Sequence, residues 1–225
     1  MNVITRSLVS LWSSSIGKKL IVALTGVVLV LFLAGHLAGN MLIYAGEKAF
    51  NDYAYFLHHM LHGAGIWIAR IVLLTCLVLH VAATIALTRQ NRSARPKYEF
   101  DATMKASRSS KIMIWSGLTI LAFVIFHILH FTVRTDADLA RLGADNPHAM
   151  VVLGFQNFLV VLFYIIAMTL LCSHLAHGVA SIFQTLGLRD QKTAQPIELL
   201  SKAYAVIIWV GFISVPLSIK LGLVG

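Results

Sequence analysis

The chain has 225 residues, of which 58% are hydrophobic and only 12% charged, and its mean hydropathy is +0.81. A water-soluble domain of this size needs far more charge to cover its surface, so this composition excludes that class and predicts a multi-pass membrane protein. The net charge of +9 comes from basic residues in short loops between apolar stretches, which is typical of the inner membrane surface. We therefore expect a protein of the bacterial cytoplasmic membrane that contacts lipid and has no nucleic-acid partner.

Five apolar stretches are long enough to span a membrane, because about 20 apolar residues cross the hydrocarbon layer. The first stretch starts too late and is too long to be a cleaved signal peptide. We expect an all-α integral membrane protein in which five transmembrane helices form one bundle, a single membrane-anchor domain over residues 1–225. The helices are expected at residues 20–44, 66–87, 112–133, 147–186 and 197–221.

The connecting segments also carry signals. The stretch AFNDYAYFLHHMLHG spaces its aromatic residues and leucines by three and four, which predicts a short helix in the membrane interface. The basic segment Thr88–Lys111 predicts a docking or lipid-facing loop. Asn146 followed by Pro147 predicts a helix start, and Pro216 predicts a kink near the outer end of the last helix.

Positive charges are concentrated on one side of the predicted spans. The N-terminal segment, the second loop and the fourth loop carry Arg6, Lys18, Lys19, Arg89, Arg92, Arg95, Lys97, Lys105, Arg108, Lys111, Arg189, Lys192 and Lys202. The opposite side has few basic residues, and acidic residues dilute them. The positive-inside rule therefore predicts a cytoplasmic N-terminus and a C-terminus outside.

The histidines sort by depth. At a rise of 1.5 Å per residue, His36 lies roughly 24 Å along the first helix and His127 roughly 22 Å along the third, so both are in the outer half. His80 and His174 lie roughly 12 Å and 14–18 Å from the cytoplasmic edge, in the inner half. A low-spin b-type haem needs two neutral imidazoles from different helices. One such histidine could be satisfied across a helix interface, but two level pairs predict two non-covalent b haems, the outer on His36 and His127 and the inner on His80 and His174.

Two cysteines, Cys76 and Cys172, lie alone in apolar runs, and the chain has no CxxC or CxxCH sequence. This pattern excludes a disulfide framework and a covalently attached c-type haem.

The first and third helices are similar in sequence: they read TGVVLVLFLAGH and SGLTILAFVIFH. Thr25 and Ser116 each stand eleven residues before a predicted outer ligand, on nearly the same helix face but three turns lower. We hypothesise that these hydroxyls contact the inner haem or its surroundings; the alternative is a bond to their own helix backbone. His130 and His177 lie one turn beyond His127 and His174, and we assign them as neighbours of the ligands, as quinone contacts or as interfacial histidines.

The sequences HLAGN, FHILHF and HLAHGVASIFQTLG, together with the lone His80 late in the second helix, resemble the di-haem cytochrome b anchor of succinate:quinone oxidoreductases of the single-subunit, five-helix type. The resemblance covers essentially the whole chain. It implies a non-flavin subunit of succinate dehydrogenase or fumarate reductase that binds a flavoprotein and an iron–sulfur subunit on the cytoplasmic side. Electrons would pass between the iron–sulfur subunit and a quinone, usually menaquinone, and the outer haem would lie on His36 and His127 and the inner on His80 and His174.

The chain departs from the family in one respect. Some members carry an acidic residue in the fourth helix near the ligand, whereas the position two residues before His174 is Cys172 here. Proton movement through such a carboxylate is therefore not expected. Candidate partners for the haem propionates remain open among Lys18, Lys19, Arg70, Arg108 and Lys111.

Three other functions stay open from the residues alone. A cytochrome b of a hydrogenase or formate dehydrogenase would use the same chemistry, and a structural anchor could have lost its haems. A divalent-metal transporter could use His58, His59 and His62 with His174 and His177 in the pore. Such a path normally needs carboxylates within the membrane, which the predicted spans lack.

Overall fold

The computed structural model describes residues 3–93 and 104–225, without some side chains near the N-terminus and between residues 92 and 114. The described residues form helices joined by turns, with no β-strand among them. Five helices are long and apolar enough to cross a membrane, which confirms the predicted all-α, five-span fold. These helices are α2 (Ser15–Met41), α4 (Ala64–Ser93), α5 (Met104–His127), α8 (Phe158–Thr185) and α9 (Ala194–Lys220).

Two spans continue in other helical forms at one end. A 3-10 turn, η1 (Leu42–Ala45), extends α2, and a π-helical turn, η2 (Ile128–Val133), extends α5. The π turn ends at Arg134, whose backbone is left-handed (φ 59°, ψ 63°). The helix α9 continues through Pro216 as far as Lys220.

The fourth predicted helix, residues 147–186, is divided in the structure. It consists of α7 (Pro147–Gly154) and α8, with a break at residues 155–157. The break occurs because Asn157 adopts an extended conformation and its side chain accepts a hydrogen bond from the Leu159 amide, which starts a new helix. At the start of α7, the Asn146 side chain accepts from the Ala149 amide and Pro147 occupies the first turn, as predicted.

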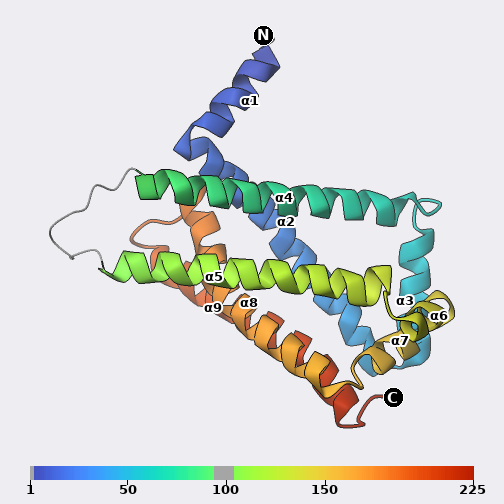
Figure 1. Cartoon of the computed structure of the whole chain (residues 1–225). Coiled ribbons are helices and arrows are strands. Elements are labelled where there is room, and N and C mark those ends of the chain that lie inside the picture. Colours follow the sequence, from blue (N-terminus) through green and yellow to red (C-terminus); the bar gives the residue numbers. More distant parts are fainter. Residues whose placement is uncertain (1–2, 94–103) are drawn as a thin grey trace.

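Short helices lie at the ends of the spans (Figure 1). The predicted interfacial helix is present as α3 (Glu47–His59), which has no buried residue. Near it lies α6 (Ala137–Asp145), capped by the Asp136 side chain. The helix α1 (Val3–Ser13) precedes the first span and was not expected from the sequence.

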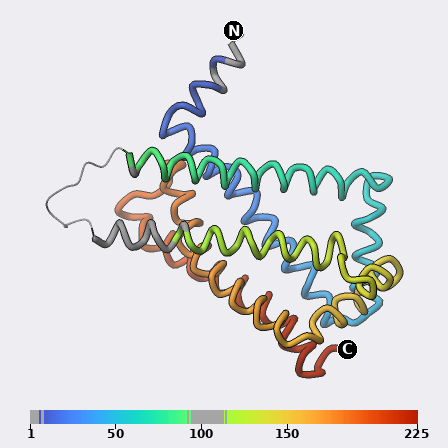
Figure 2. Tube along the Cα trace, viewed as in Figure 1, coloured from blue at the N-terminus to red at the C-terminus, as the bar shows by residue number. Residues whose placement is uncertain are grey.

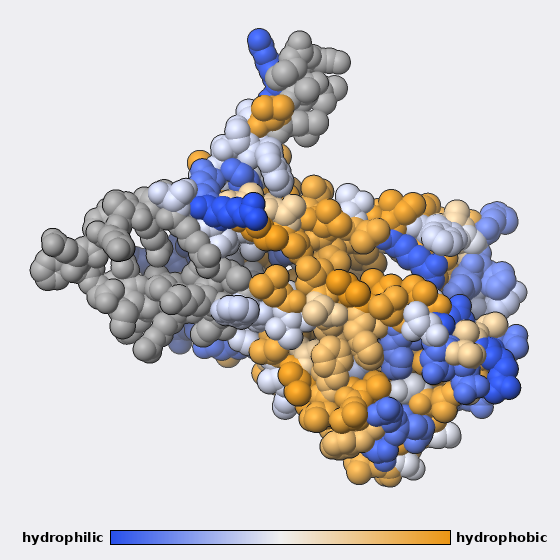
Figure 3. All heavy atoms as spheres, viewed as in Figure 1, coloured by the Kyte–Doolittle hydropathy of each residue, from blue (hydrophilic) through white to orange (hydrophobic). Residues whose placement is uncertain are grey.

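The core of the bundle lies between α2, α8 and α9. The helices α8 and α9 pack along each other, and α2 packs against α4, α8 and α9. The helix α5 packs mainly against α8, and few residues in the apolar stretches of α4 and α5 are buried. Hydrophobic residues form the broad middle of the surface, and hydrophilic residues gather toward its ends (Figure 3). This distribution fits a bundle whose middle lies in lipid.

Candidate functional site

The predicted outer pair, His36 and His127, meets in the structure. The centroids of their rings are 5.8 Å apart and the ring planes are nearly perpendicular, at 80°. Two imidazoles that share one metal ion have ring centroids roughly 6 Å apart, since each metal–nitrogen bond is about 2 Å long. The supporting helices, α2 and α5, make almost no close backbone contact with each other. The two rings therefore contact each other although their helices barely touch, and their spacing is close to that of two imidazoles on one metal ion.

Aromatic rings surround this pair. Phe32 stacks on His36 with a centroid distance of 5.2 Å, and Phe212 approaches the same ring at 5.6 Å. Phe123 stacks on His127 at 5.8 Å. Among the described residues, neither nitrogen of His36 has a hydrogen-bond partner. An imidazole in such surroundings is costly without a partner, so a bound ligand would stabilise it.

A tyrosine holds the other side of the outer pair. The hydroxyl of Tyr164, on α8, lies 3.1 Å from His127 Nδ1 and 3.2 Å from His130 Nδ1. A hydroxyl has one proton, so Tyr164 can donate to only one of these nitrogens and must accept from the other. Tyr164 was not predicted as a functional residue from the sequence. Its position in the sequence could have indicated it, because a tyrosine inside a membrane span needs a hydrogen-bond partner.

Thr25 contacts the first histidine of the predicted inner pair. Its Oγ1 lies 3.1 Å from His80 Nδ1 and also donates to the carbonyl oxygen of Ile21 at 2.6 Å. Because the hydroxyl proton is used on the carbonyl, Nδ1 of His80 must be the donor in the contact with Thr25. His80 is then the tautomer whose Nε2 carries a lone pair. Thr25 therefore bonds both its own helix backbone and the His80 ring.

Ser116 repeats this arrangement on the second histidine. Its Oγ lies 3.3 Å from His174 Nδ1 and donates to the Met113 carbonyl oxygen at 3.2 Å. The same count of protons leaves Nε2 of His174 unprotonated. The next residue, Gly117, faces the ring, because a Cβ there would lie 3.7 Å from His174 Cε1. The sequence similarity between the first and third helices therefore corresponds to a repeated structural unit. In each unit a hydroxyl contacts Nδ1 of a histidine and a glycine lies beside its ring.

His80 and His174 lie close enough to interact electrostatically, although α4 and α8 make almost no close contact. Gly26 lies beside the His80 ring as Gly117 does beside the His174 ring. On α8, a Cβ at Gly178 would meet nothing within 4 Å. Gly39, by contrast, makes room for the Tyr53 ring, which a Cβ would approach to 2.7 Å.

No family model matches the chain, and neither a curated protein nor a solved structure matches it. Its function is therefore inferred from its own residues.

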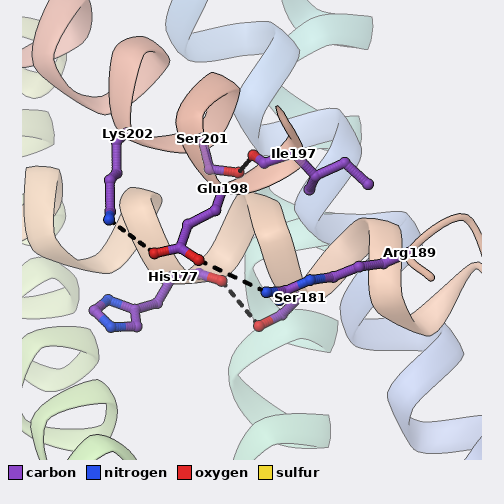
Figure 4. Close-up of polar contacts among 7 residues, drawn as sticks. All are labelled: His177, Ser181, Arg189, Ile197, Glu198, Ser201 and Lys202. Atoms are coloured by element: carbon purple, nitrogen blue, oxygen red, sulfur yellow. Dashed lines mark hydrogen bonds and ion pairs between the residues drawn. The ribbon is translucent and has the colours of Figure 1, made fainter. Parts of the chain in front are cut away.

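His177 follows His174 by one turn on α8 and interacts with it electrostatically. Its ring is exposed, and Nδ1 bonds the carbonyl oxygen of Ser173 in the same helix. Figure 4 shows it beside Glu198, whose carboxylate accepts from Lys202 at 2.7 Å and pairs with Arg189 at 3.9 Å. His177 therefore belongs to a charged cluster between the end of α8 and the start of α9.

The remaining candidates have other partners. His58 and His59 bond carbonyl oxygens of their own helix, and the described residues contain no group of three or more His, Cys, Asp or Glu able to hold a metal ion. Lys18 is buried and donates to the Ser13 carbonyl and to Gln90. Arg70 lies over the ring of Trp67. The side chains of Arg108 and Lys111 lie outside the described part.

Proposed function

We propose that this chain is the membrane anchor and electron-transfer subunit of a succinate dehydrogenase or fumarate reductase, and that it holds two b haems. One observation carries the proposal. Four different spans each carry one of the candidate imidazoles, and the imidazoles form two groups, His36 with His127 and His80 with His174.

The donor set fits the haem groups. An axial histidine is neutral, presents one ring nitrogen to the metal and gives the other N–H to a neighbouring acceptor. His80 and His174 are in that state because Thr25 and Ser116 accept from their Nδ1 atoms. No fully buried side-chain nitrogen or oxygen among the described residues lacks a partner, so a ring nitrogen without a protein partner is accessible to a ligand.

Tyr164 gives His127 of the outer pair the same chemistry. If His127 is a ligand, its Nδ1–H donates to the Tyr164 oxygen, and the Tyr164 proton is donated to His130 Nδ1. His130 is then a hydrogen-bond acceptor that fixes the direction of the Tyr164 hydroxyl. The phenylalanines around His36 and His127 give this pair apolar surroundings.

When bound, the two haems would supply one-electron carriers at two depths between a cytoplasmic iron–sulfur subunit and a quinone. The chain itself would hold and orient the imidazoles. A charged group beside them, inside the membrane-spanning bundle, would be energetically costly. The bias of basic residues supports a cytoplasmic N-terminus and puts the flavoprotein and the iron–sulfur subunit on that side. The link to succinate, the flavoprotein and iron–sulfur partners, and menaquinone as the quinone rest on the resemblance alone.

The test is purification of the tagged chain expressed together with the genes that flank its own. We expect a protein with a covalent flavin and an iron–sulfur protein to co-purify, and the complex to reduce a quinone with succinate. Co-purification of a hydrogenase or formate dehydrogenase large subunit would assign the same haem site to a different enzyme. A chain with haem but no succinate-linked partner would also contradict the proposal.

A further inference from the structure

The helix α1 leaves the bundle sideways. Figures 1 and 2 show it projecting away from the other helices, across the direction of α4 and α5, at the end of the bundle where α2 begins. It packs against α2 and makes little contact with any other element. The side chains that the structure describes on α1, those of Arg6 and residues 9–13, are exposed.

The joint between α1 and α2 is built to fix this direction. Ser14 has an extended backbone (φ −84°, ψ 148°), which ends α1, and its side chain accepts from the Gly17 amide at 2.9 Å, which starts α2. A Cβ at Gly17 would overlap the carbonyl oxygen of Leu11. Only glycine therefore lets the last turn of α1 approach the first turn of α2 so closely.

A buried lysine ties the same joint to a second span. Lys18, only 8% exposed, donates to the Ser13 carbonyl oxygen at 3.3 Å and to Gln90 Oε1 at 3.0 Å. Gln90, near the end of α4, in turn donates to the hydroxyl of Ser15 at 3.1 Å. These bonds join the end of α1, the start of α2 and the end of α4. The sideways direction of α1 is thus held by side chains from two spans.

One face of α1 is apolar and exposed. Leu11 and Trp12 are 37% and 42% exposed. At about 100° per residue, Arg6 and Ser10 point to roughly the opposite side of the helix. The apolar surface continues onto α2 at Ile16, which is 81% exposed.

We infer that α1 lies in the membrane interface and that its Leu11–Trp12 face binds the lipid surface. Because α2 crosses the membrane, its first turn lies at the membrane edge, and a helix that leaves sideways from this point lies in the plane of the interface. Tryptophan is favoured at this depth, where its apolar ring and its N–H meet different surroundings. Arg6 is the one charged residue of α1, so burial of apolar side chains, and not attraction to anionic headgroups, supplies the binding. The inference rests on the five spans and does not depend on haem.

Spin-label scanning of the full chain in lipid nanodiscs, with one copy per disc, tests it. In a background of Cys76→Ser and Cys172→Ser, single labelled cysteines replace Leu11 or Trp12 on one face, and Arg6 or Ser10 on the other. Collisions with oxygen report lipid, and collisions with a water-soluble nickel complex report solvent. We expect labels at 11 and 12 to favour oxygen by several-fold, and labels at 6 and 10 to favour nickel.

Two results would overturn the inference. Nickel access at all four positions would put α1 in water. Labels at 11 and 12 shielded from both reagents would assign this face to a protein. Gly17→Ala should displace α1 and remove the oxygen preference at position 12, whereas Gly35→Ala, whose Cβ meets nothing within 4 Å, should leave it unchanged.

Discussion

Tyr164 determines how the two histidines of VIFHILHF differ. Both rings contact its hydroxyl. Because the phenol has a single proton, Tyr164 donates a hydrogen bond to one ring and accepts one from the other. With His127 as a ligand, His127 donates to the Tyr164 oxygen and Tyr164 donates to His130. The same residue explains how one nitrogen of each of two half-buried imidazoles, three residues apart, finds a partner in an apolar segment.

Tyr164→Phe removes the acceptor of the His127 N–H. Loss of this bond makes the imidazole a weaker electron donor, so the midpoint potential of the outer haem should rise. The rise should be on the order of tens of millivolts, since such a bond contributes about 1 kcal/mol. Redox titration of the purified protein measures it, with both haems retained. Tyr204→Phe is a matched control, because that hydroxyl bonds the Val30 carbonyl and no histidine; equal shifts in both variants would contradict this role of Tyr164.

Thr25→Val and Ser116→Ala remove the hydroxyls that accept from His80 and His174. Each change should shift the spectrum or the potential of the inner haem alone, because both hydroxyls contact the inner pair. Thr119→Val serves as control, since Thr119 bonds only the carbonyl oxygen of Trp115. Unchanged spectra and potentials in the double variant of Thr25 and Ser116 would show that the two bonds have no effect on the cofactor.

At the scale of the elements, the long spans could be predicted from the sequence because a bilayer fixes their length. The break at residues 155–157 could not, since mean hydropathy over a long apolar run hides a single capping residue such as Asn157. The helix α1 was missed for the opposite reason: it is short and half polar, so it lacks a continuous apolar run. The π turn that carries His130 also leaves no periodic signal.

The contact between α7 and η2 depends on Gly154. A Cβ at this position would lie 2.7 Å from the ring of Phe131 and 3.3 Å from His130 Cε1, and Phe155 and Tyr164 enclose that Phe131 ring. Gly154→Ala should therefore destabilise the protein by about 1–3 kcal/mol, as overpacking does. Thermal unfolding in detergent measures this loss, and the spectrum of the outer haem should change before that of the inner. Gly35→Ala, which meets open space, should do neither; equal melting temperatures for the two variants would contradict the packing described.

For the whole molecule, the depths of the histidines followed from the sequence because the helical rise is constant. The structure brings His36 and His127 together as those depths predict. Lateral packing was not predictable, since it depends on the shapes of whole helix faces. The selection of Tyr164 as a shared partner, and the position of Tyr53 beside Gly39, both arise from such packing.

The distribution of basic residues makes a prediction about orientation. A reporter fused after Gly225 should behave as non-cytoplasmic, and one inserted in the Thr88–Lys111 loop as cytoplasmic. Paired enzymatic reporters that are active on opposite sides of the membrane measure both positions. The reverse result would exchange the inner and outer assignments, and with them the side on which soluble partners dock.

The central claim is that four histidines hold two haems in two pairs. The most direct measurement is a reduced-minus-oxidised spectrum with haem quantified per chain, for the unmodified protein and for His36→Ala, His80→Ala, His127→Ala and His174→Ala. We expect two low-spin b haems in the unmodified chain. Each variant should lose one haem or convert it to high spin, with His36 and His127 affecting one spectral component and His80 and His174 the other.

His130→Ala and His177→Ala are the matched controls, and both should keep two low-spin haems. A chain without haem would contradict the account, and so would a pairing of His36 with His80. If His130→Ala removes a haem while His127→Ala leaves two low-spin haems, the ligand lies one turn further along the helix than we infer.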